Sequence, residues 1–279
     1  MIETKELDGR FLDVSNILIK QLDVSYGPHV RHKLDIYYPK KVKKRLPCIF
    51  FVHGGAFIKG DKRRYQLKGA LQAIEKGYVV VSINYRLLPE YTYPSWFEDI
   101  NAAIRYIDYY ADELYIDKEN YIVWGESAGA LLTMVNALEQ TQRFVNRKIN
   151  NYPNQYKIKI IIDQYGPTDL IKENNEKMDI REHQFHMKGV ELINTLISVS
   201  PVSLVHKNAP YLIIQHGLDD KIVMPQQSRF LYETYKKYHI AEKVYMYMYE
   251  GLQHNPEQFF EKTDDIFKSI LKINEKIKK

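Results

Sequence analysis

The chain has 279 residues, of which 45% are hydrophobic, 27% charged and 13% aromatic, and it carries a formal net charge of +5. These values are typical of a folded globular protein and exclude a disordered, collagen-like or disulfide-stapled chain. The basic excess is spread along the sequence, and its densest stretch, 40–45, has no interleaved aromatic residues. We therefore expect no nucleic-acid or membrane partner.

Cysteine usage and the N-terminal composition bear on the cellular compartment. Cys48 is the single cysteine and lies in an apolar run, which predicts a small buried side chain in reducing surroundings. The first ten residues lack the basic and apolar regions of a secretory leader, and no 18 apolar residues run together. These features predict a cytoplasmic protein.

Apolar runs of strand length recur along the chain, and from residue 50 onward most of them are followed by a segment of helical period. The predicted strands are 17–24, 33–38, 47–54, 78–85, 120–125, 158–166, 210–217 and 243–249. The predicted helices are 65–76, 94–111, 128–140, 226–238 and 256–276. A short turn joins the first two strands, so we expect an antiparallel start. The later alternation predicts a mostly parallel sheet with helices on both faces, an α/β fold.

The chain shows no change of composition, no Gly/Ser-rich linker and no internal repeat, so we expect one domain over 1–279. One connection is unusually long. About 45 residues separate the predicted strands 158–166 and 210–217, more than a normal loop needs. We interpret 170–205 as a small insertion or partial lid at one end of the sheet.

A candidate nucleophile follows the predicted strand 120–125. Gly125-Glu126-Ser127-Ala128-Gly129 leads from this strand directly into a helical segment. In such a strand-turn-helix context, the serine of a G-x-S-x-G sequence is exposed on a strained turn, and the glycines allow the close backbone approach that the turn requires. Ser127 is therefore the predicted nucleophile.

A glycine-rich turn ends the predicted strand 47–54, where the sequence reads HGGAF from His53. A tetrahedral intermediate of acyl transfer needs preorganised N–H donors, and such a turn supplies backbone amides without obstruction. The predicted oxyanion hole consists of the amides of Gly55, Ala56 and Ala128.

The candidate acid and base lie further along the chain. Asp219 and Asp220 follow the predicted strand 210–217, and His254 lies between the last strand and the last helix. The carboxyl ends of parallel strands share one edge of a sheet, so Ser127, one aspartate and His254 can meet there. The order serine, acid, histidine is that of α/β-hydrolases. Spacing alone leaves either aspartate as the acid.

Several motifs together resemble the esterase/lipase branch of the α/β-hydrolases, related to hormone-sensitive lipase and small bacterial carboxylesterases. They are HGGA at 53–56, NYRLLPE at 84–90, P-x-x-x-x-D-I at 94–100, GESAG at 125–129, HGLDDKIV at 216–223, and His254. The resemblance covers residues 34–268. It implies an α/β-hydrolase fold with a reduced cap and carboxylesterase activity, with no metal or organic cofactor.

Carried over position by position, the resemblance makes Ser127 the nucleophile, His254 the base and Asp220 the acid. The acid is the fifth residue of an H-G-x-x-D stretch in this family, which favours Asp220 over Asp219. Four further matches are structural in the family and are left out of the site: Tyr85, Arg86, Glu90 and Asp99.

The chain also departs from the family pattern. HGGA and GESAGA stand where the family often has HGGG and GDSAGG, so Ala56 and Glu126 differ. Both substitutions leave the backbone amides available, and they bear on substrate fit rather than on the chemistry.

The substrate expected is a small-molecule ester. Only 52 residues precede His53, fewer than the helical cap of larger lipase-like relatives requires. An open site suits short acyl chains, acetyl to butyryl, or aryl esters. An amidase, formamidase or short-peptide hydrolase with the same triad is the alternative, and a hydrolase-fold binding protein without catalysis is a second. The sequence is compatible with a homo-oligomer.

The other histidines receive structural interpretations. His183 and His186 stand near Glu182, but no further ligand at metal-site spacing accompanies them, so we expect no metal site. We interpret His216 as a packing residue at the end of its strand.

Overall fold

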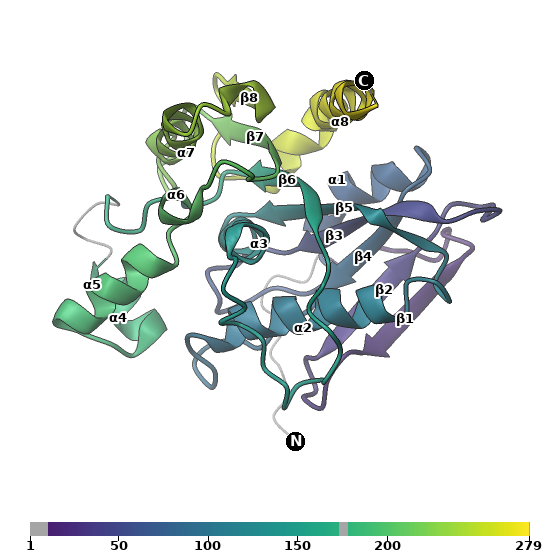
Figure 1. Ribbon diagram of the computed structural model, residues 1–279, viewed down its shortest axis with the longest axis horizontal. Coiled ribbons are helices and arrows are strands. Elements are labelled where there is room, and N and C mark those ends of the chain that lie inside the picture. Colours follow the sequence, from purple (N-terminus) through teal and green to yellow (C-terminus); the bar gives the residue numbers. More distant parts are fainter. Residues whose placement is uncertain (1–10, 173–177, 279) are drawn as a thin grey trace.

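The computed structural model describes residues 11–172 and 178–278 (Figure 1). The first ten residues, in which the sequence predicts no leader, and 173–177 of the predicted insertion lie outside this part of the chain. The described strands form one eight-stranded sheet in the order β1-β2-β4-β3-β5-β6-β7-β8. The strands are β1 (Lys20–Ser25), β2 (Lys33–Tyr37), β3 (Leu46–Val52), β4 (Val79–Ile83), β5 (Ile116–Glu126), β6 (Ile158–Gln164), β7 (Tyr211–Gly217) and β8 (Val244–Tyr249).

The sheet begins antiparallel and continues parallel. β2 pairs antiparallel with both β1 and β4, and every pair from β4 to β8 is parallel. The predicted mostly parallel sheet with an antiparallel start is thus confirmed. The strands lie where the apolar runs predict them, although β5 begins four residues earlier than expected, at Ile116.

Each central strand supplies side chains to two hydrophobic cores. In β3, Cys48, Phe50 and Val52 lie in one core, whereas Ile49 and Phe51 lie in the other. Alternate residues of a strand point to opposite faces, so a continuous apolar run is what a strand covered on both sides requires. Cys48 is buried, as predicted, and burial raises the pKa of its thiol well above the ordinary value.

Helices cover both faces of the sheet, as predicted. Helices α2 (Ser95–Tyr109), α3 (Ala128–Leu138) and α7 (Gln226–Lys237) contribute to one core. Helices α1 (Lys68–Leu71) and α8 (Thr263–Ile277) pack on the opposite face (Figure 1). Within residues 11–172 and 178–278, no helix is both long and apolar enough to cross a bilayer.

Two predicted helices are wrong in part, because 3₁₀ turns replace α-helix in them. Segment 65–76 consists of η1 (Tyr65–Leu67), α1 and η2 (Gln72–Ile74), and 256–276 begins as η5 (Pro256–Lys262). These short segments pack on each other. The Gln72 side chain donates to the Phe260 carbonyl at 3.2 Å and accepts from the Thr263 hydroxyl at 2.6 Å. Such long-range bonds favour irregular turns, and periodicity does not reveal them. A further turn, η4 (Ala241–Lys243), precedes β8.

The long connection between β6 and β7 contains α4 (Met178–Phe185), α5 (Gly189–Ser198) and α6 (Pro201–Leu204). Figure 1 shows α4 and α5 at the margin of the molecule, on the side of the sheet away from α1 and α8. Phe185 at the end of α4 stacks on Tyr93 with ring centroids 5.4 Å apart. The interpretation of 170–205 as a partial lid on a single domain stays a prediction.

Candidate active site

Ser127 occupies a strained turn between β5 and α3. Its backbone has φ 52° and ψ −120°, a conformation that residues with a side chain rarely adopt. Hydrogen bonds hold it there: its amide donates to the Gln164 carbonyl at 3.0 Å, and its carbonyl accepts from the Ala130 amide at 3.0 Å. The turn therefore presents the serine at the carboxyl edge of the sheet, where open α/β sheets bind their ligands.

The glycines that flank the serine permit close packing. A Cβ atom at Gly125 would lie 2.4 Å from the Gly129 carbonyl oxygen, and one at Gly129 would lie 2.1 Å from the Val52 oxygen. No side chain fits at either position. The first turn of α3 can consequently rest against the end of β3, which brings the HGGA loop next to Ser127.

His254 connects the serine to an aspartate. Its Nε2 atom lies 2.8 Å from Ser127 Oγ, and its Nδ1 atom lies 2.6 Å from Asp220 Oδ2. The three side chains come from the segments that follow β5, β7 and β8. This chain of hydrogen bonds has the geometry of a nucleophile, a general base and an orienting carboxylate.

Of the two candidate acids, the structure brings Asp220 to His254. Asp220 is 1% exposed, and its Oδ1 atom accepts from the amides of Ile222 and Val223 at 2.8 and 2.9 Å. Burial alone would raise its pKa, but hydrogen bonds from His216 and His254 outweigh it and hold the pKa of Asp220 well below the usual range. Asp220 is thus ionised at neutral pH, whereas Asp219 is exposed to solvent.

His216 supports the acid, a contact that the sequence did not reveal. It is fully buried at the end of β7, the position predicted for a packing residue. Its Nε2 atom lies 2.8 Å from the Val223 carbonyl and 3.3 Å from Asp220 Oδ2, while Nδ1 lies 2.7 Å from Ser228 Oγ. Because the Val223 carbonyl can only accept, Nε2 carries a proton and faces the carboxylate.

The HGGA loop passes beside the nucleophile. A Cβ atom at Gly54 would lie 3.1 Å from the Cβ of Ser127. The Gly55 carbonyl accepts from the amides of Ile58 and Lys59 at 3.0 and 3.1 Å. Since the C=O and N–H of a trans peptide point in opposite directions, the Ala56 amide is turned away from these two donors.

The third predicted oxyanion donor is the amide of Ala128. Ala128 is the first residue of α3, and the first amides of a helix have no acceptor within it. The predicted donors therefore come from the two segments that contact each other at Ser127: Gly55 and Ala56 from the HGGA loop, and Ala128 from the helix.

The sequence did not predict the surroundings of two residues beside the triad, Glu126 and Tyr165, although it marked Glu126 as a departure from the family pattern. Glu126 is buried, and the Gln66 side chain donates to its Oε2 atom at 3.1 Å. Burial raises the pKa of Glu126 to about 8. Tyr165 packs edge-on against His254, with ring centroids 4.8 Å apart. Gln66 lies 60 residues before Glu126, and no local pattern in the sequence joins them.

Of the four family-matching residues left out of the site, Tyr85, Arg86 and Asp99 make contacts that brace the loops. The Tyr85 hydroxyl donates to the His53 carbonyl at 3.1 Å, and the two rings stack 4.5 Å apart. The Arg86 guanidinium donates to Asp99 at 2.7 Å. Glu90 is exposed. These contacts link the end of β4 to β3 and α2.

The histidines of the insertion do not form a metal centre. His183 and His186 are exposed, with ring centroids 6.0 Å apart. Over residues 11–172 and 178–278, no group of three or more His, Cys, Asp or Glu side chains is arranged to hold a metal ion.

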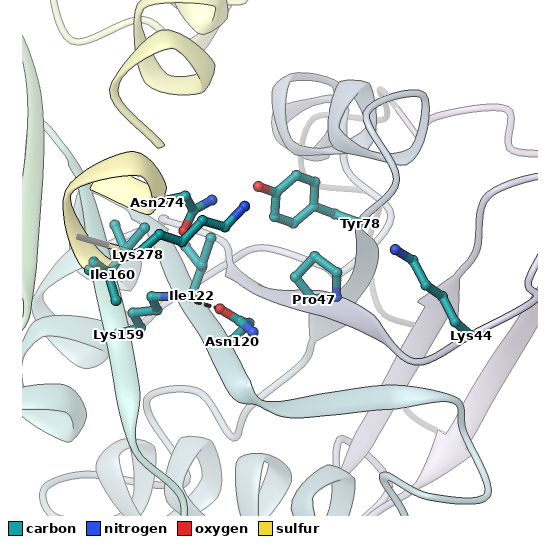
Figure 2. A pocket seen from close by; sticks show the side chains of 10 residues that line it. Lys44, Pro47, Tyr78, Asn120, Ile122, Lys159, Ile160, Asn274 and Lys278 are labelled. Atoms are coloured by element: carbon teal, nitrogen blue, oxygen red, sulfur yellow. Dashed lines mark hydrogen bonds between the residues drawn. The ribbon is translucent and has the colours of Figure 1, made fainter. Parts of the chain in front are cut away.

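A separate cavity of about 400 Å³ lies at the other end of the parallel strands, near the start of β3 and β6. Figure 2 shows its lysines, Lys44, Lys159 and Lys278, around an apolar floor that includes Pro47. The Lys159 ammonium group donates to Asn120 Oδ1 at 2.5 Å. The cavity is at the amino ends of the strands, whereas Ser127 follows a carboxyl end, so it has no part in the triad site.

Comparison with known proteins gives a family match over most of the chain. The BD-FAE family model matches residues 34–235. Esterase LipQ of Mycobacterium tuberculosis is 29% identical over 215 residues, which make up 74% of this chain and 50% of that protein. The chain spans about half the length of the first curated relatives that it matches.

Solved structures share the fold. A truncated form of a carbohydrate esterase from gut microbiota superposes with a TM-score of 0.79 at 23% identity, over 93% of this chain and 99% of that one. Esterase B from Lactobacillus rhamnosis gives 0.76 at 18% identity, over 92% and 86% of the two chains. The α/β-hydrolase fold implied by the motifs is thereby confirmed.

Proposed function

The chain belongs to the BD-FAE family of α/β-hydrolase esterases, and we propose that it is a serine carboxylesterase acting on short-chain acyl esters, acetyl to butyryl, or on aryl esters. The observation that carries the proposal is the unbroken hydrogen-bond chain from Ser127 through His254 to Asp220. Relatives named as esterases support the reaction class.

In the acylation half of the reaction, Ser127 Oγ attacks the ester carbonyl carbon while His254 Nε2 takes the hydroxyl proton. The carbonyl oxygen becomes an oxyanion and accepts hydrogen bonds from the amides of Gly55, Ala56 and Ala128. Ionised Asp220 stabilises the imidazolium. The intermediate then expels the alcohol oxygen, which takes the proton from His254, and the acyl group remains on Ser127.

In the deacylation half, His254 removes a proton from a water molecule, whose oxygen attacks the acyl carbon. A second tetrahedral oxyanion forms in the same amide cradle. Its collapse breaks the bond to Ser127 Oγ, which recovers its proton from His254, and the carboxylic acid leaves. The triad is unchanged after one turnover.

The short-chain preference is supported by the access to the triad. The His254 side chain remains 13% exposed, and Ala56 is exposed beside the serine. A small acyl group needs no long apolar tunnel, so an accessible triad suits it.

Hydrolysis of p-nitrophenyl esters from acetyl to palmitoyl, with Ser127→Ala measured beside the wild type, tests the proposal. We expect activity to peak at two to four carbons and turnover to fall by about 10⁶ in the variant, as for the serine of subtilisin. Labelling of the folded wild type, and not of Ser127→Ala, by a fluorophosphonate probe is the matched control. Equal activity in both proteins would refute Ser127 as the nucleophile.

Matched ester and amide substrates separate the esterase from an amidase with the same triad. The pair p-nitrophenyl acetate and p-nitroacetanilide presents the same acyl group to Ser127. We expect the ester to be the better substrate by kcat/KM. A higher kcat/KM on the amide, with Ser127 still required, would replace the carboxylesterase by an amidase.

A further inference from the structure

We propose that Gln184, in helix α4 of the insertion, is a positioning residue for the oxyanion hole, because its side-chain amide holds the peptide that follows Ala56. This inference rests on the proposed function, since it concerns the same acyl-transfer site. It connects the insertion to the chemistry through a defined contact with the HGGA loop.

The contact is a partly buried hydrogen bond with a fixed orientation. Gln184 is 3% exposed, and its Nε2 atom donates to the Ala56 carbonyl at 3.2 Å. Its Oε1 atom accepts from the Arg181 guanidinium at 2.8 Å. An arginine can only donate and a backbone carbonyl can only accept, so the amide cannot turn over without losing both bonds. Arg181, one helical turn earlier, thus aims Gln184 at the loop.

The loop needs such a restraint because its backbone is strained. Ala56 has φ 54° and Phe57 has φ 66°, the left-handed region that residues with a Cβ atom disfavour. The preceding peptide is held through the Gly55 carbonyl by the amides of Ile58 and Lys59. Gln184 holds the next peptide through the Ala56 carbonyl. The Ala56 amide, a predicted oxyanion donor, lies between these two anchors.

Aromatic packing joins the same two segments at a second point. Phe57 stacks on Trp96 with ring centroids 4.2 Å apart and an interplanar angle of 10°. Phe185, the neighbour of Gln184, meets the Trp96 ring edge-on at 5.9 Å. This packing fixes the end of α4 relative to the loop, and it does so without the Gln184 hydrogen bond. Removal of that bond should therefore release the Ala56 peptide while α4 stays in place.

The expected effect is confined to the transition state. Preorganised donors accelerate acyl transfer when they are aimed at the oxyanion, which the ground-state ester does not yet carry. Loss of one oxyanion donor costs roughly 10²–10³ in kcat in subtilisin. A donor that is misaimed rather than removed should cost less, on the order of tenfold to a hundredfold.

Two variants of the intact chain test the proposal. Gln184→Glu keeps the acceptor for Arg181 but replaces the donor to Ala56 by a carboxylate oxygen. Gln184→Met has similar length and lacks both groups. His183→Ala, an exposed position on the same helix, is the matched control. For each protein, kcat and KM are measured on p-nitrophenyl butyrate, together with the unfolding temperature and the Ki of an alkyl trifluoromethyl ketone.

The ketone reports the oxyanion directly. Ser127 Oγ adds to its carbonyl carbon, the hydroxyl proton passes to His254, and a tetrahedral oxyanion remains in the amide cradle. We expect both Gln184 variants to lower kcat tenfold to a hundredfold and to raise the Ki of the ketone by a similar factor. Their KM should change less than threefold. The control should behave as the wild type.

Other results would overturn the proposal. If kcat stays at the wild-type value in Gln184→Glu with an unchanged unfolding temperature, Gln184 does not position the loop. If kcat falls but the Ki of the ketone does not rise, the role of Gln184 is structural. The proposed function is judged separately: it fails if Ser127→Ala remains active, whatever the Gln184 variants do.

Discussion

The loop after β7 buries a carboxyl group next to His254, and the last residue of β5 buries another next to Ser127, yet the two groups differ in charge. Asp220 is 1% exposed and Glu126 is 3% exposed. Hydrogen bonds from His216 and His254, together with backbone amides, outweigh burial and lower the pKa of Asp220. Burial dominates at Glu126, where Gln66 is a hydrogen-bond donor, and raises its pKa to about 8. The balance between burial and hydrogen-bond donors decides which acid ionises: Glu126 is enclosed more deeply by protein, whereas Asp220 accepts from two histidines and backbone amides.

The difference suits the proposed reaction. An ionised Asp220 stabilises the positive charge that His254 acquires. A protonated Glu126 places no second negative charge beside the serine, where the oxyanion develops. Two carboxyl groups in one site thus hold opposite protonation states at neutral pH, the arrangement by which enzymes divide roles between similar groups.

Among the changes that test this contrast, removal of the charge of Asp220 should have the largest effect. Asp220→Asn keeps the shape of the side chain but cannot hold His254 in the correct tautomer, so turnover should drop by roughly 10⁴. Steady-state hydrolysis of p-nitrophenyl acetate measures this loss. Asp219→Asn, next in sequence but exposed, is the matched control and should retain nearly full activity. A larger loss of activity in Asp219→Asn than in Asp220→Asn would show that Asp219 is the acid.

A smaller effect should follow from replacing the carboxyl group of Glu126 by an amide. Because the folded protein binds the Glu126 proton more tightly than the unfolded chain, this group stabilises the fold below its ordinary pKa of 4.5, and the contribution is lost as the pH rises to about 8. Glu126→Gln removes this dependence. The unfolding free energy of the variant relative to the wild type should therefore increase between pH 5 and pH 9, on the order of 3 kcal/mol.

Urea denaturation of both proteins at several pH values measures the difference. Asp163 is also buried, and burial raises its pKa to about 7, but it is present in both proteins and cancels in the comparison. A relative free energy that does not change with pH would mean that Glu126 is ionised throughout the range, and the contrast with Asp220 would disappear.

The sequence predicted the parts of the site that short motifs define. GESAG and HGLDD each place a proposed catalytic residue after a strand, and parallel strands bring their carboxyl ends to one edge. The sequence could not predict the environment of these residues. Gln66 reaches Glu126 across 60 residues and Gln184 reaches Ala56 across 128, so each contact depends on the packing of the whole fold.

The same limit applies to the secondary structure. Helical periodicity located the segment after β3 but did not distinguish α-helix from the 3₁₀ turns η1 and η2, because both bury one apolar side. The bonds of Gln72 to Phe260 and Thr263, which hold these turns against η5, join residues about two-thirds of the chain apart. Tertiary contacts of this kind override local propensity.

The smallest effect concerns the backbone of the oxyanion loop. Ala56 stands where the family often has glycine, and its φ of 54° explains that preference. Ala56→Gly should remove a penalty of about 1–2 kcal/mol for an alanine in the left-handed region. Glycine also loses about 0.5–1 kcal/mol more conformational entropy on folding. The net result should be a gain of about 0.5 kcal/mol in urea denaturation, whereas Ala137→Gly within α3 should cost about 1 kcal/mol. If Ala56→Gly lowers the free energy of unfolding as much as Ala137→Gly does, the left-handed strain of Ala56 is negligible. The surroundings would then shift the pKa values of the two acids without straining the backbone of the oxyanion loop.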